Sequence, residues 1–382
     1  MTDTVYKLDP EVLIGRDTIN RTGTISGSYG RKILLVTEQG LYENNRIERL
    51  HGILEEAGME TIIFDETPSQ AMADTAENAA SLARGARCDL ILGFGGIRTQ
   101  YIARLISVLA VSNFGVFELL DGETNDENVF LPFIAVPTAG GDPFLLSDYL
   151  VAIDPRDRFV KLVKCPRRLC KAVILDSGLS ESVSGKFLST AAFDGFCAAL
   201  EAYCSIKANF LSDALLEQAL ALYAKIMNSG VGNAQMDFSM DSTNAALLMA
   251  MGTSASSPGI GTALAFALNG KFPVAKSWCS TVLLPYVMEK LVSARPEKLA
   301  KVASLMGEIT EGVNTADAAG MAVESIRRLM GQLSVPARLK DFNLTLDRLV
   351  PAAEAARGLE FIAFSPWAVS SEDAYDLLKQ AF

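Results

Sequence analysis

A carboxylate in a predicted buried helix is the side chain best placed to do chemistry in this chain. Asp194 lies in segment 191–205, which is rich in Ala, contains one Gly and no Pro, and so predicts a helix. Asp194 and Ala198 share one face of it, because residues four apart stack along a helix. Phe193 and Phe196 flank Asp194, and a lone carboxylate among apolar groups costs free energy unless something positive meets it. We therefore expect a cation opposite Asp194.

A glycine turn is the second candidate for chemistry. The residues Gly95, Gly96, Ile97 and Arg98 follow a predicted strand and open a predicted helix. Glycine lets the backbone approach a ligand, and the free N–H groups at a helix N-terminus attract phosphate. Arg98 could add a charge-assisted contact. A tight strand-to-helix connection needs the same glycines, so a purely structural turn is the equal alternative.

Glu38 is the third candidate, because it follows the first predicted strand. An acidic side chain there can accept hydrogen bonds from both ribose hydroxyls of NAD, whereas the 2′-phosphate of NADP would be repelled. An exposed loop glutamate is the alternative. If a dinucleotide binds, Glu38 favours NAD over NADP.

The first half of the chain alternates between predicted strands and helices. Short apolar runs indicate strands buried on both faces, and alternation of this kind indicates parallel βαβ units. Residues 1–30 predict irregular or hairpin structure, and the acidic segment 113–129 predicts a surface loop. The predicted strands are 32–37, 60–65, 88–95, 131–138 and 171–176, the helices are 40–57, 72–86 and 98–112, and a hairpin joins 149–154 to 159–163.

The second half predicts helices almost to the end. The polar segment 177–186 is the predicted boundary. We therefore predict an α/β, Rossmann-like dinucleotide-binding domain over 1–180 and an all-helical domain over 181–382, with the active-site cleft between them. The predicted helices are 188–206, 212–229, 241–253, 259–269, 276–292, 296–309, 315–333, 345–356 and 370–381.

Charge and composition narrow the possible partners. The formal net charge of −11 disfavours nucleic acid and anionic membranes, because phosphate would be repelled. No apolar run reaches membrane-spanning length, and the N-terminus lacks the pattern of a signal peptide. We expect a cytoplasmic protein whose six cysteines are reduced thiols. The one histidine, His51, lies on a predicted amphipathic surface helix, so no histidine remains for a metal site or a Ser–His pair.

Taken together, these residues resemble the iron-containing (group III) alcohol dehydrogenases, a family with glycerol dehydrogenase-like members and a more distant similarity to dehydroquinate synthase. The resemblance covers essentially the whole chain and implies that fold. It rests on the strand end Val36-Thr37-Glu38, the turn Gly95-Gly96, the segments 136–140 and 172–176, Asp194 with Glu201 to Ser205, and the segment 282–285.

The resemblance implies an NAD(P)-binding domain and a divalent metal held by one Asp and up to three His. The Asp falls on Asp194, but the histidine positions read Ala198, Thr262, Phe266 and Lys276. We therefore expect no bound transition metal. The family's third glycine reads Ile97 and its following serine reads Arg98. The positions matching the cofactor site are Glu38, Gly95, Gly96, Ile97, Arg98 and Thr138.

Lys276 is the expected partner of Asp194, with Phe266 filling the vacated volume. In a functional interpretation, the ammonium polarises a carbonyl oxygen and stabilises a developing alkoxide, and Lys276 or Thr262 relays the proton. In the alternative interpretation, Asp194 and Lys276 form a buried ion pair that remained after catalysis was lost.

The resulting functional prediction is an NAD(P)-linked alcohol dehydrogenase or carbonyl reductase without a His-ligated metal. It would transfer hydride to or from a small alcohol or aldehyde. One alternative is a non-catalytic relative that binds a nucleotide or metabolite, or serves as an assembly subunit. Another is a lyase or cyclase with tightly held NAD, as in the dehydroquinate synthase branch. The resemblance also implies a homodimer or larger homo-oligomer.

Overall fold

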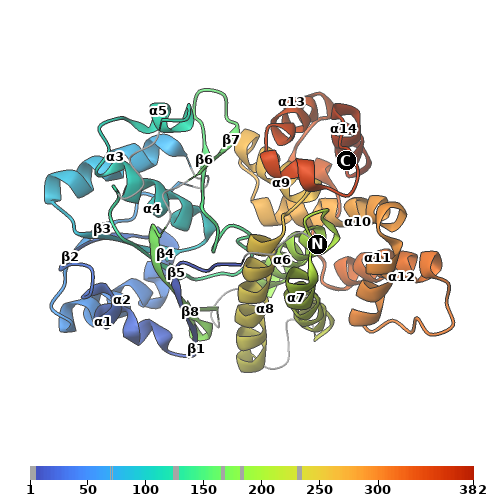
Figure 1. Cartoon of the computed structure of the whole chain (residues 1–382), viewed down its shortest axis with the longest axis horizontal. Helices are drawn as coiled ribbons and strands as arrows, with labels where there is room; N and C mark the ends of the chain where they lie inside the picture. The colour runs from blue at the N-terminus through green and yellow to red at the C-terminus, as the bar shows by residue number, and fades with distance from the viewer. Residues whose placement is uncertain are drawn as a thin grey trace. The chain divides into compact units, whose positions relative to one another are not determined.

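The chain divides into two compact units. The structure, a computed structural model, describes residues 6–68, 70, 72–123, 129–164, 168–180, 185–229 and 235–382 (Figure 1). One unit comprises Lys7–Ala139 and Leu146–Ser182, and the other comprises Met1–Tyr6, Gly140–Leu145 and Val183–Phe382. The segment Gly140–Leu145 thus belongs to the helical unit, whereas a single division at residue 180 leaves it with the α/β domain. The predicted boundary segment 177–186 lies partly outside the described residues.

A parallel sheet forms the centre of the α/β unit, as the apolar runs predicted. Its strands are arranged in the order β1-β8-β5-β4-β2-β3, and every pairing in it is parallel. A separate antiparallel pair, β6 (Tyr149–Ile153) and β7 (Val160–Lys164), confirms the predicted hairpin. The strands of the large sheet are β1 (Glu11–Gly15), β2 (Lys32–Val36), β3 (Glu60–Phe64), β4 (Leu90–Gly95), β5 (Phe133–Pro137) and β8 (Cys170–Asp176).

The N-terminal segment differs from its prediction. Residues 1–30 were expected to be irregular or a hairpin, but β1 is an edge strand that pairs in parallel with β8, with Leu13 opposite Ile174. Its strand partner is about half a chain away, so no local turn signals the pairing. The carboxylate of Asp176 secures the turn after β1 by accepting hydrogen bonds from the backbone N–H groups of Asp17 and Ile19, each at 3.0 Å.

Helices cover both faces of the sheet. Alternate residues of each strand point to opposite faces, and one face buries Ile33, Leu35 and Leu92 in a cluster with Leu50 and Leu54 of α2. The helices α1 and α2 lie on one side of the sheet, and α3 and α4 lie on the other (Figure 1). The described helices of this unit are α1 (Thr22–Ser26), α2 (Arg46–Glu56), α3 (Ala73–Ala86), α4 (Ile97–Leu109) and α5 (Val116–Leu120), with 3-10 turns η1 (Thr18–Arg21), η2 (Gln39–Asn44) and η3 (Ser177–Ser180).

Two of these elements correct details of the prediction. The helix expected over 40–57 begins as the 3-10 turn η2 before α2, and the loop expected over 113–129 contains the short helix α5. His51 lies half-buried on α2, whose buried face carries Ile47, Leu50 and Leu54, as the amphipathic pattern predicted.

The strand order creates a topological switch point between β2 and β4. The chain passes from β2 to β3 on one side and then crosses to β4 on the other side of β2. In open α/β sheets, ligands bind beyond the carboxyl ends of strands at such a point. Glu38 follows the carboxyl end of β2, and Gly96 follows that of β4. The fold therefore brings two of the predicted cofactor residues to this switch point.

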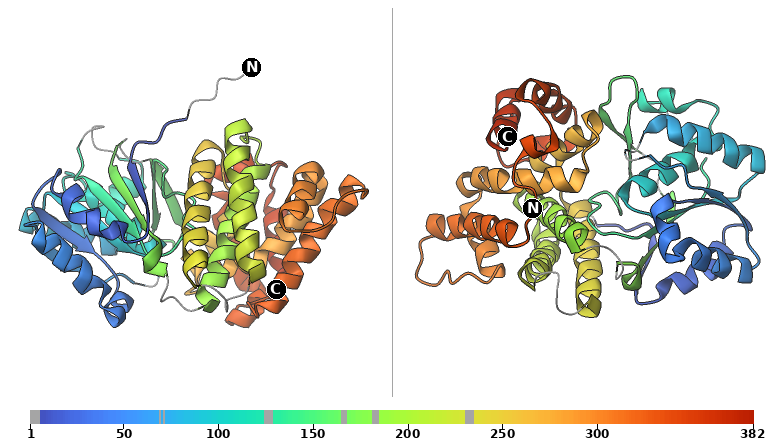
Figure 2. Two further views of the ribbon diagram at one scale, coloured as in Figure 1. Left: turned by 90° about the horizontal axis from the view of Figure 1, so that it is seen from below. Right: turned by 180° about the vertical axis from the view of Figure 1, so that it is seen from behind.

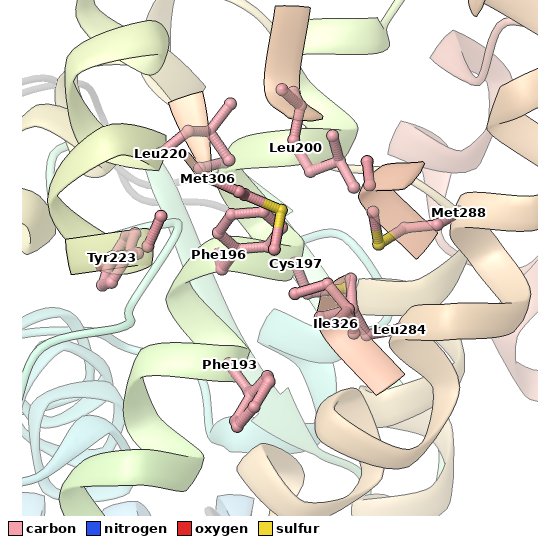
Figure 3. Close-up of a cluster of buried hydrophobic side chains, with 14 of the residues drawn as sticks. Phe193, Phe196, Cys197, Leu200, Leu220, Tyr223, Leu284, Met288, Met306 and Ile326 are labelled. Carbon is pink, nitrogen blue, oxygen red and sulfur yellow. The ribbon is translucent and has the colours of Figure 1, made fainter. Parts of the chain in front are cut away.

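The second unit is helical, as predicted. The long helices α6, α7 and α8 run side by side (Figure 2). Phe196, Cys197 and Leu200 of α6 belong to a buried cluster that includes Leu220 and Met306 (Figure 3). Its helices are α6 (Gly185–Cys204), α7 (Phe210–Ser229), α8 (Gln235–Ala255), α9 (Ile260–Lys271), α10 (Lys276–Ala294), α11 (Pro296–Leu305), α12 (Thr315–Gln332), α13 (Leu346–Arg357) and α14 (Ser371–Gln380), with 3-10 turns η4 (Leu339–Phe342) and η5 (Glu360–Phe364).

The described residues also bear on two predictions made for the whole chain, those of reduced cysteines and of no membrane-spanning segment. Five cysteines are described, at 88, 170, 197, 204 and 279, and each is a free thiol; Cys165 lies outside the described residues. Within the described part of the chain, no helix combines the length and apolarity that crossing a membrane requires.

Candidate functional site

Asp194 and Lys276 form a buried ion pair within the helical unit. Asp194 lies in α6, and Lys276 is the first residue of α10. The Lys276 Nζ donates to Asp194 Oδ1 at 2.6 Å, and the two side chains are 8% and 3% exposed respectively. The predicted pairing of these residues, 82 positions apart in sequence, is therefore confirmed.

Lys276 lies at the amino end of α10, where a positive charge needs the nearby carboxylate of Asp194. The amino end of a helix carries partial positive charge, so an ammonium at the first position of α10 is in an unfavourable field. Asp194 compensates that field and is itself compensated, because a buried charge needs a partner. The backbone of Gly141 approaches the other oxygen: a β-carbon at position 141 would lie 3.6 Å from Asp194 Oδ2. Gly141 has a φ of +109°, so a side chain there would also strain the backbone.

An aromatic cluster borders the ammonium. The Lys276 Nζ lies 5.0 Å from the centroid of the Phe266 ring, which fits a cation–π contact. Phe144 lies 5.9 Å from Phe266 and 5.6 Å from Phe361, measured between ring centroids. Phe266 thus occupies volume beside the ion pair, as expected, and gives that side of the lysine an apolar wall.

Thr262 lies in a different arrangement from the one expected for a proton relay. Its hydroxyl donates to Glu201 Oε2 at 2.7 Å, and its backbone N–H donates to the same oxygen at 3.0 Å. The Glu201 carboxylate also accepts from the backbone N–H groups of Gly259 and Gly261. Glu201 therefore satisfies the amino end of α9, whose first N–H groups have no partner within the helix. The hydroxyl proton of Thr262 is therefore already used in the hydrogen bond to Glu201.

Glu201 is the residue that sequence reasoning missed as part of the site's support. It lies seven residues after Asp194 and so on the same face of α6, and it is buried. Burial raises its pKa, while the hydrogen bonds from Thr262, Gly261 and Gly259 oppose that shift. Two carboxylates spaced by two helical turns, together with the glycines at 259 and 261, were the available signal. Glu201 fixes the helix that carries Phe266.

Two thiols flank the ion pair. Cys197 follows Asp194 by three residues on α6, and Cys279 follows Lys276 by three residues on α10; both are fully buried. Burial, and secondarily the negative charges of Glu201 and Asp194, raise the pKa of Cys197 well above its usual value. Burial and then Asp194 raise the pKa of Cys279 as well. Both sulfurs are therefore protonated thiols at neutral pH, a form that neither attacks substrates nor binds metals well.

The predicted cofactor residues meet at the glycine turn of the α/β unit. Glu38 Oε1 accepts from the Gly96 backbone N–H at 3.1 Å, and Glu38 Oε2 accepts from Arg98 Nη2 at 2.7 Å. The backbone N–H of Thr138 donates to the Gly95 carbonyl at 3.1 Å. Ile97, the first residue of α4, is half-buried. Sequence reasoning placed these residues at one site but did not foresee the bond between Glu38 and Arg98.

Gln100 holds this turn against α4 and was not anticipated either. Its side-chain amide donates to the carbonyls of Gly93 and Gly95 at 3.0 and 3.1 Å. A β-carbon at Gly95 would lie 2.7 Å from the Thr99 hydroxyl oxygen, so glycine is required there by close approach. These contacts fix the carboxyl end of β4 against the first turns of α4.

Within the ranges that the structure describes, no group of three or more His, Cys, Asp or Glu side chains is arranged to hold a metal ion.

Comparison with known proteins agrees with this architecture. The family "Iron-containing alcohol dehydrogenase" matches residues 9–177, and "Fe-containing alcohol dehydrogenase family, C-terminal" matches residues 189–382. The 1,3-propanediol dehydrogenase of Citrobacter freundii is 26% identical over 356 residues, which cover 92% of each protein. The NAD-dependent methanol dehydrogenase of Bacillus methanolicus is 23% identical over 382 residues, covering 99% of this chain and 100% of that protein.

A solved structure described as a 1,3-propanediol oxidoreductase matches with a TM-score of 0.92 and 26% identity, covering 100% of both chains. The two relatives named above are alcohol dehydrogenases by name. By the two family matches, which together span nearly the whole chain, this protein belongs to the iron-containing alcohol dehydrogenase family.

Proposed function

We propose that this protein is an NAD(P)-linked oxidoreductase that interconverts a small alcohol and its aldehyde or ketone, with Lys276 acting where the family places a metal. The observation that carries the proposal is the buried contact at 2.6 Å between Lys276 Nζ and Asp194 Oδ1. It supports the proposal because a cation already balances the one carboxylate at the position that corresponds to the metal site.

The side chains around Asp194 do not fit a divalent metal ion. Iron and zinc need three or four nitrogen, sulfur or oxygen ligands. The positions that would supply them carry a methyl group at Ala198, a phenyl ring at Phe266, and the ammonium of Lys276, while the Thr262 hydroxyl serves Glu201. The neighbouring thiols are held protonated by burial.

The residues at the glycine turn fit the phosphates of a dinucleotide. The turn lies at the topological switch point, it opens the amino end of α4, and the guanidinium of Arg98 is 42% exposed beside it. Backbone N–H groups and Arg are the donors that phosphate prefers. Gly95, Gly96, Ile97, Arg98 and Thr138 would surround the cofactor, and NAD is favoured by its use in the methanol dehydrogenase relative. When bound, the cofactor supplies or accepts a hydride.

Lys276 is proposed to bind the substrate oxygen. An ammonium has three N–H donors, and Asp194 takes one of them. A second can hydrogen-bond to the carbonyl oxygen of an aldehyde and stabilise the negative charge that grows there as the carbonyl carbon accepts a hydride. The alkoxide then takes a proton from the ammonium, giving the alcohol and a neutral amine that regains its proton from water. Asp194 keeps the amine in place through the contact at 2.6 Å.

Phe266, Phe144 and Phe361 are proposed to shape what can approach the lysine. An apolar wall strengthens a hydrogen bond from the ammonium, because the local dielectric is lower than in water. It also favours a small substrate with little charge of its own. A short-chain alcohol or aldehyde is therefore the substrate class that we propose.

A non-catalytic role is the second candidate, and one observation favours it. Asp194 and Lys276 pair with each other, and both side chains are almost inaccessible to solvent. A chain that had lost catalysis could keep such a pair, because removing one member alone is costly. In that case the α/β unit would still bind a nucleotide or a metabolite without turnover.

Two assays separate the candidates. NADH fluorescence is titrated with the protein in the presence and absence of EDTA, and a panel of short aldehydes is then reduced at stoichiometric enzyme. We expect binding and turnover that EDTA does not abolish, and loss of turnover in Lys276→Ala with NADH binding retained. Lys290→Ala, on the same helix but in a partly exposed pair at 3.8 Å, is the matched control and should retain activity. NADH binding without turnover in the wild type would support the non-catalytic candidate instead.

A further inference from the structure

The glycine turn already binds an anion, which is the carboxylate of Glu38 from the same chain. The Glu38 carboxylate accepts from the backbone N–H of Gly96, the residue that caps the amino end of α4, and from the guanidinium of Arg98. The two contacts measure 3.1 and 2.7 Å, and the Glu38 side chain is only 17% exposed. The carboxylate thus uses one backbone donor and one side-chain cation at once.

Glu38 is also what covers this part of the turn. A β-carbon built on Gly96 would meet, among the described residues, only Glu38 Oε1 within 4 Å, at a distance of 3.6 Å. By contrast, a β-carbon built on Gly95 would be within 3 Å of Thr99. Gly96 therefore faces open space apart from the carboxylate, and withdrawal of Glu38 would expose its N–H group together with the Arg98 guanidinium.

A phosphate and this carboxylate would compete for the same groups. A backbone N–H at a helix amino end and an adjacent guanidinium are ordinary phosphate donors. Two anions cannot share them, because like charges a few ångströms apart repel. A phosphate that binds here must therefore displace Glu38, and Arg98 must exchange one anionic partner for another.

We propose that Glu38 is a built-in counter-anion of the glycine turn, and that its bond to Arg98 sets the affinity of the turn for phosphate groups. The inference rests on the proposed function only in taking the cofactor's phosphates as the displacing group. Its effect on the affinity for a dinucleotide is opposite to that of the role expected from the sequence, in which Glu38 accepts hydrogen bonds from ribose. A ribose acceptor strengthens dinucleotide binding, whereas a competing carboxylate weakens it.

The substitution Glu38→Gln separates the two roles. Glutamine keeps the size and a carbonyl oxygen for the Gly96 N–H, but it removes the negative charge that holds Arg98. Dissociation constants for ADP are measured by isothermal titration calorimetry and those for NADH by its fluorescence. We expect Glu38→Gln to bind ADP about tenfold more tightly, the gain that corresponds to one released charge-assisted hydrogen bond. Glu43→Gln removes the same charge from an exposed position on η2 and should leave the affinity unchanged.

Arg98 gives the second half of the test. In an Arg98→Ser background, the Glu38→Gln substitution should produce a much smaller gain in ADP affinity, because the cation that the phosphate would capture is gone. Circular dichroism at the temperature of the titration checks that each variant is folded. Equal gains with and without Arg98 would overturn the proposed role of the ion pair.

The outcomes also separate this inference from the proposed function. If the wild type binds NADH and Glu38→Gln binds ADP and NADH no more tightly, the function stands and the counter-anion role is wrong. If Glu38→Gln gains affinity for ADP but no variant binds NADH, the counter-anion role stands and the proposed oxidoreductase fails. Absence of ADP binding in every folded variant would overturn the inference.

Discussion

Replacing Lys276 by methionine should destabilise the helical unit far more than the same change at an exposed lysine. Methionine keeps the length of the side chain and removes the charge, so Asp194 is left buried without its cation. At 2.6 Å the attraction between the two charges is of order 6 kcal/mol for an effective dielectric constant of about 20. Much of that attraction offsets desolvation of the two groups. Breaking a buried pair on one side nevertheless costs about 3–5 kcal/mol.

The assay can be confined to the unit that contains the pair. Both tryptophans of the chain, Trp278 and Trp367, belong to the helical unit, and Trp278 stacks on Phe342 with ring centroids 5.4 Å apart. Urea unfolding followed by tryptophan fluorescence therefore reports this unit. Lys290→Met is the matched control, because its pair with Asp373 is 3.8 Å long and partly exposed; such pairs contribute about 0–1 kcal/mol.

A double-mutant cycle tests the cause of the loss. Asp194→Asn alone should also destabilise the unit, and Asp194→Asn with Lys276→Met together should cost clearly less than the sum of the single changes. The reasoning is refuted if Lys276→Met loses no more stability than Lys290→Met. It is also refuted if the two single losses simply add, because the charges would then be independent.

Two further predictions concern the buried groups around the pair. Because burial raises the pKa of Glu201 above its usual value, this residue contributes stability at low pH that is lost as the pH rises from 4.5 through the raised pKa. The free energy of unfolding should therefore fall over that range by more in the wild type than in Glu201→Gln, measured by urea unfolding at several pH values; equal slopes would contradict this. Because burial also raises the pKa of the Cys197 and Cys279 thiols, iodoacetamide at pH 8 should label them in urea but barely in the native protein, as read by peptide mass spectrometry. Rapid native labelling of either would show that the surroundings of the ion pair are open.

Much of the fold followed from apolar patterning. Short apolar runs such as the one in β2, alternating with helices, were sufficient to predict the parallel sheet and its helices. The strand β1 was missed because it is short, partly exposed and paired with a strand about 160 residues later, so its sequence carries no local signal. The helix α5 was missed because five residues are too few for a clear helical period.

The part of the candidate site that could be predicted from the sequence is the ion pair, because a buried charge needs an opposite one. A buried Asp194 required a cation, and the family resemblance located Lys276, whose contact is confirmed. The partners of Glu201 and Glu38 were not predictable. Each carboxylate accepts from backbone N–H groups, which are the same in every sequence, and also from one side chain distant in sequence, Thr262 for Glu201 and Arg98 for Glu38. Their geometry depends on how the ends of α9 and α4 are placed, which residue types do not specify.

The metal content of the protein tests the central claim most directly. The protein is purified without chelator, incubated with Fe²⁺ or Zn²⁺, desalted, and analysed by plasma mass spectrometry, with Asp194→Asn treated in parallel. If the ammonium of Lys276 balances Asp194, the wild type will retain far less than one metal ion per chain and will match the variant. Retention of about one iron or zinc ion per chain by the wild type, with loss of that ion in Asp194→Asn, would contradict the account.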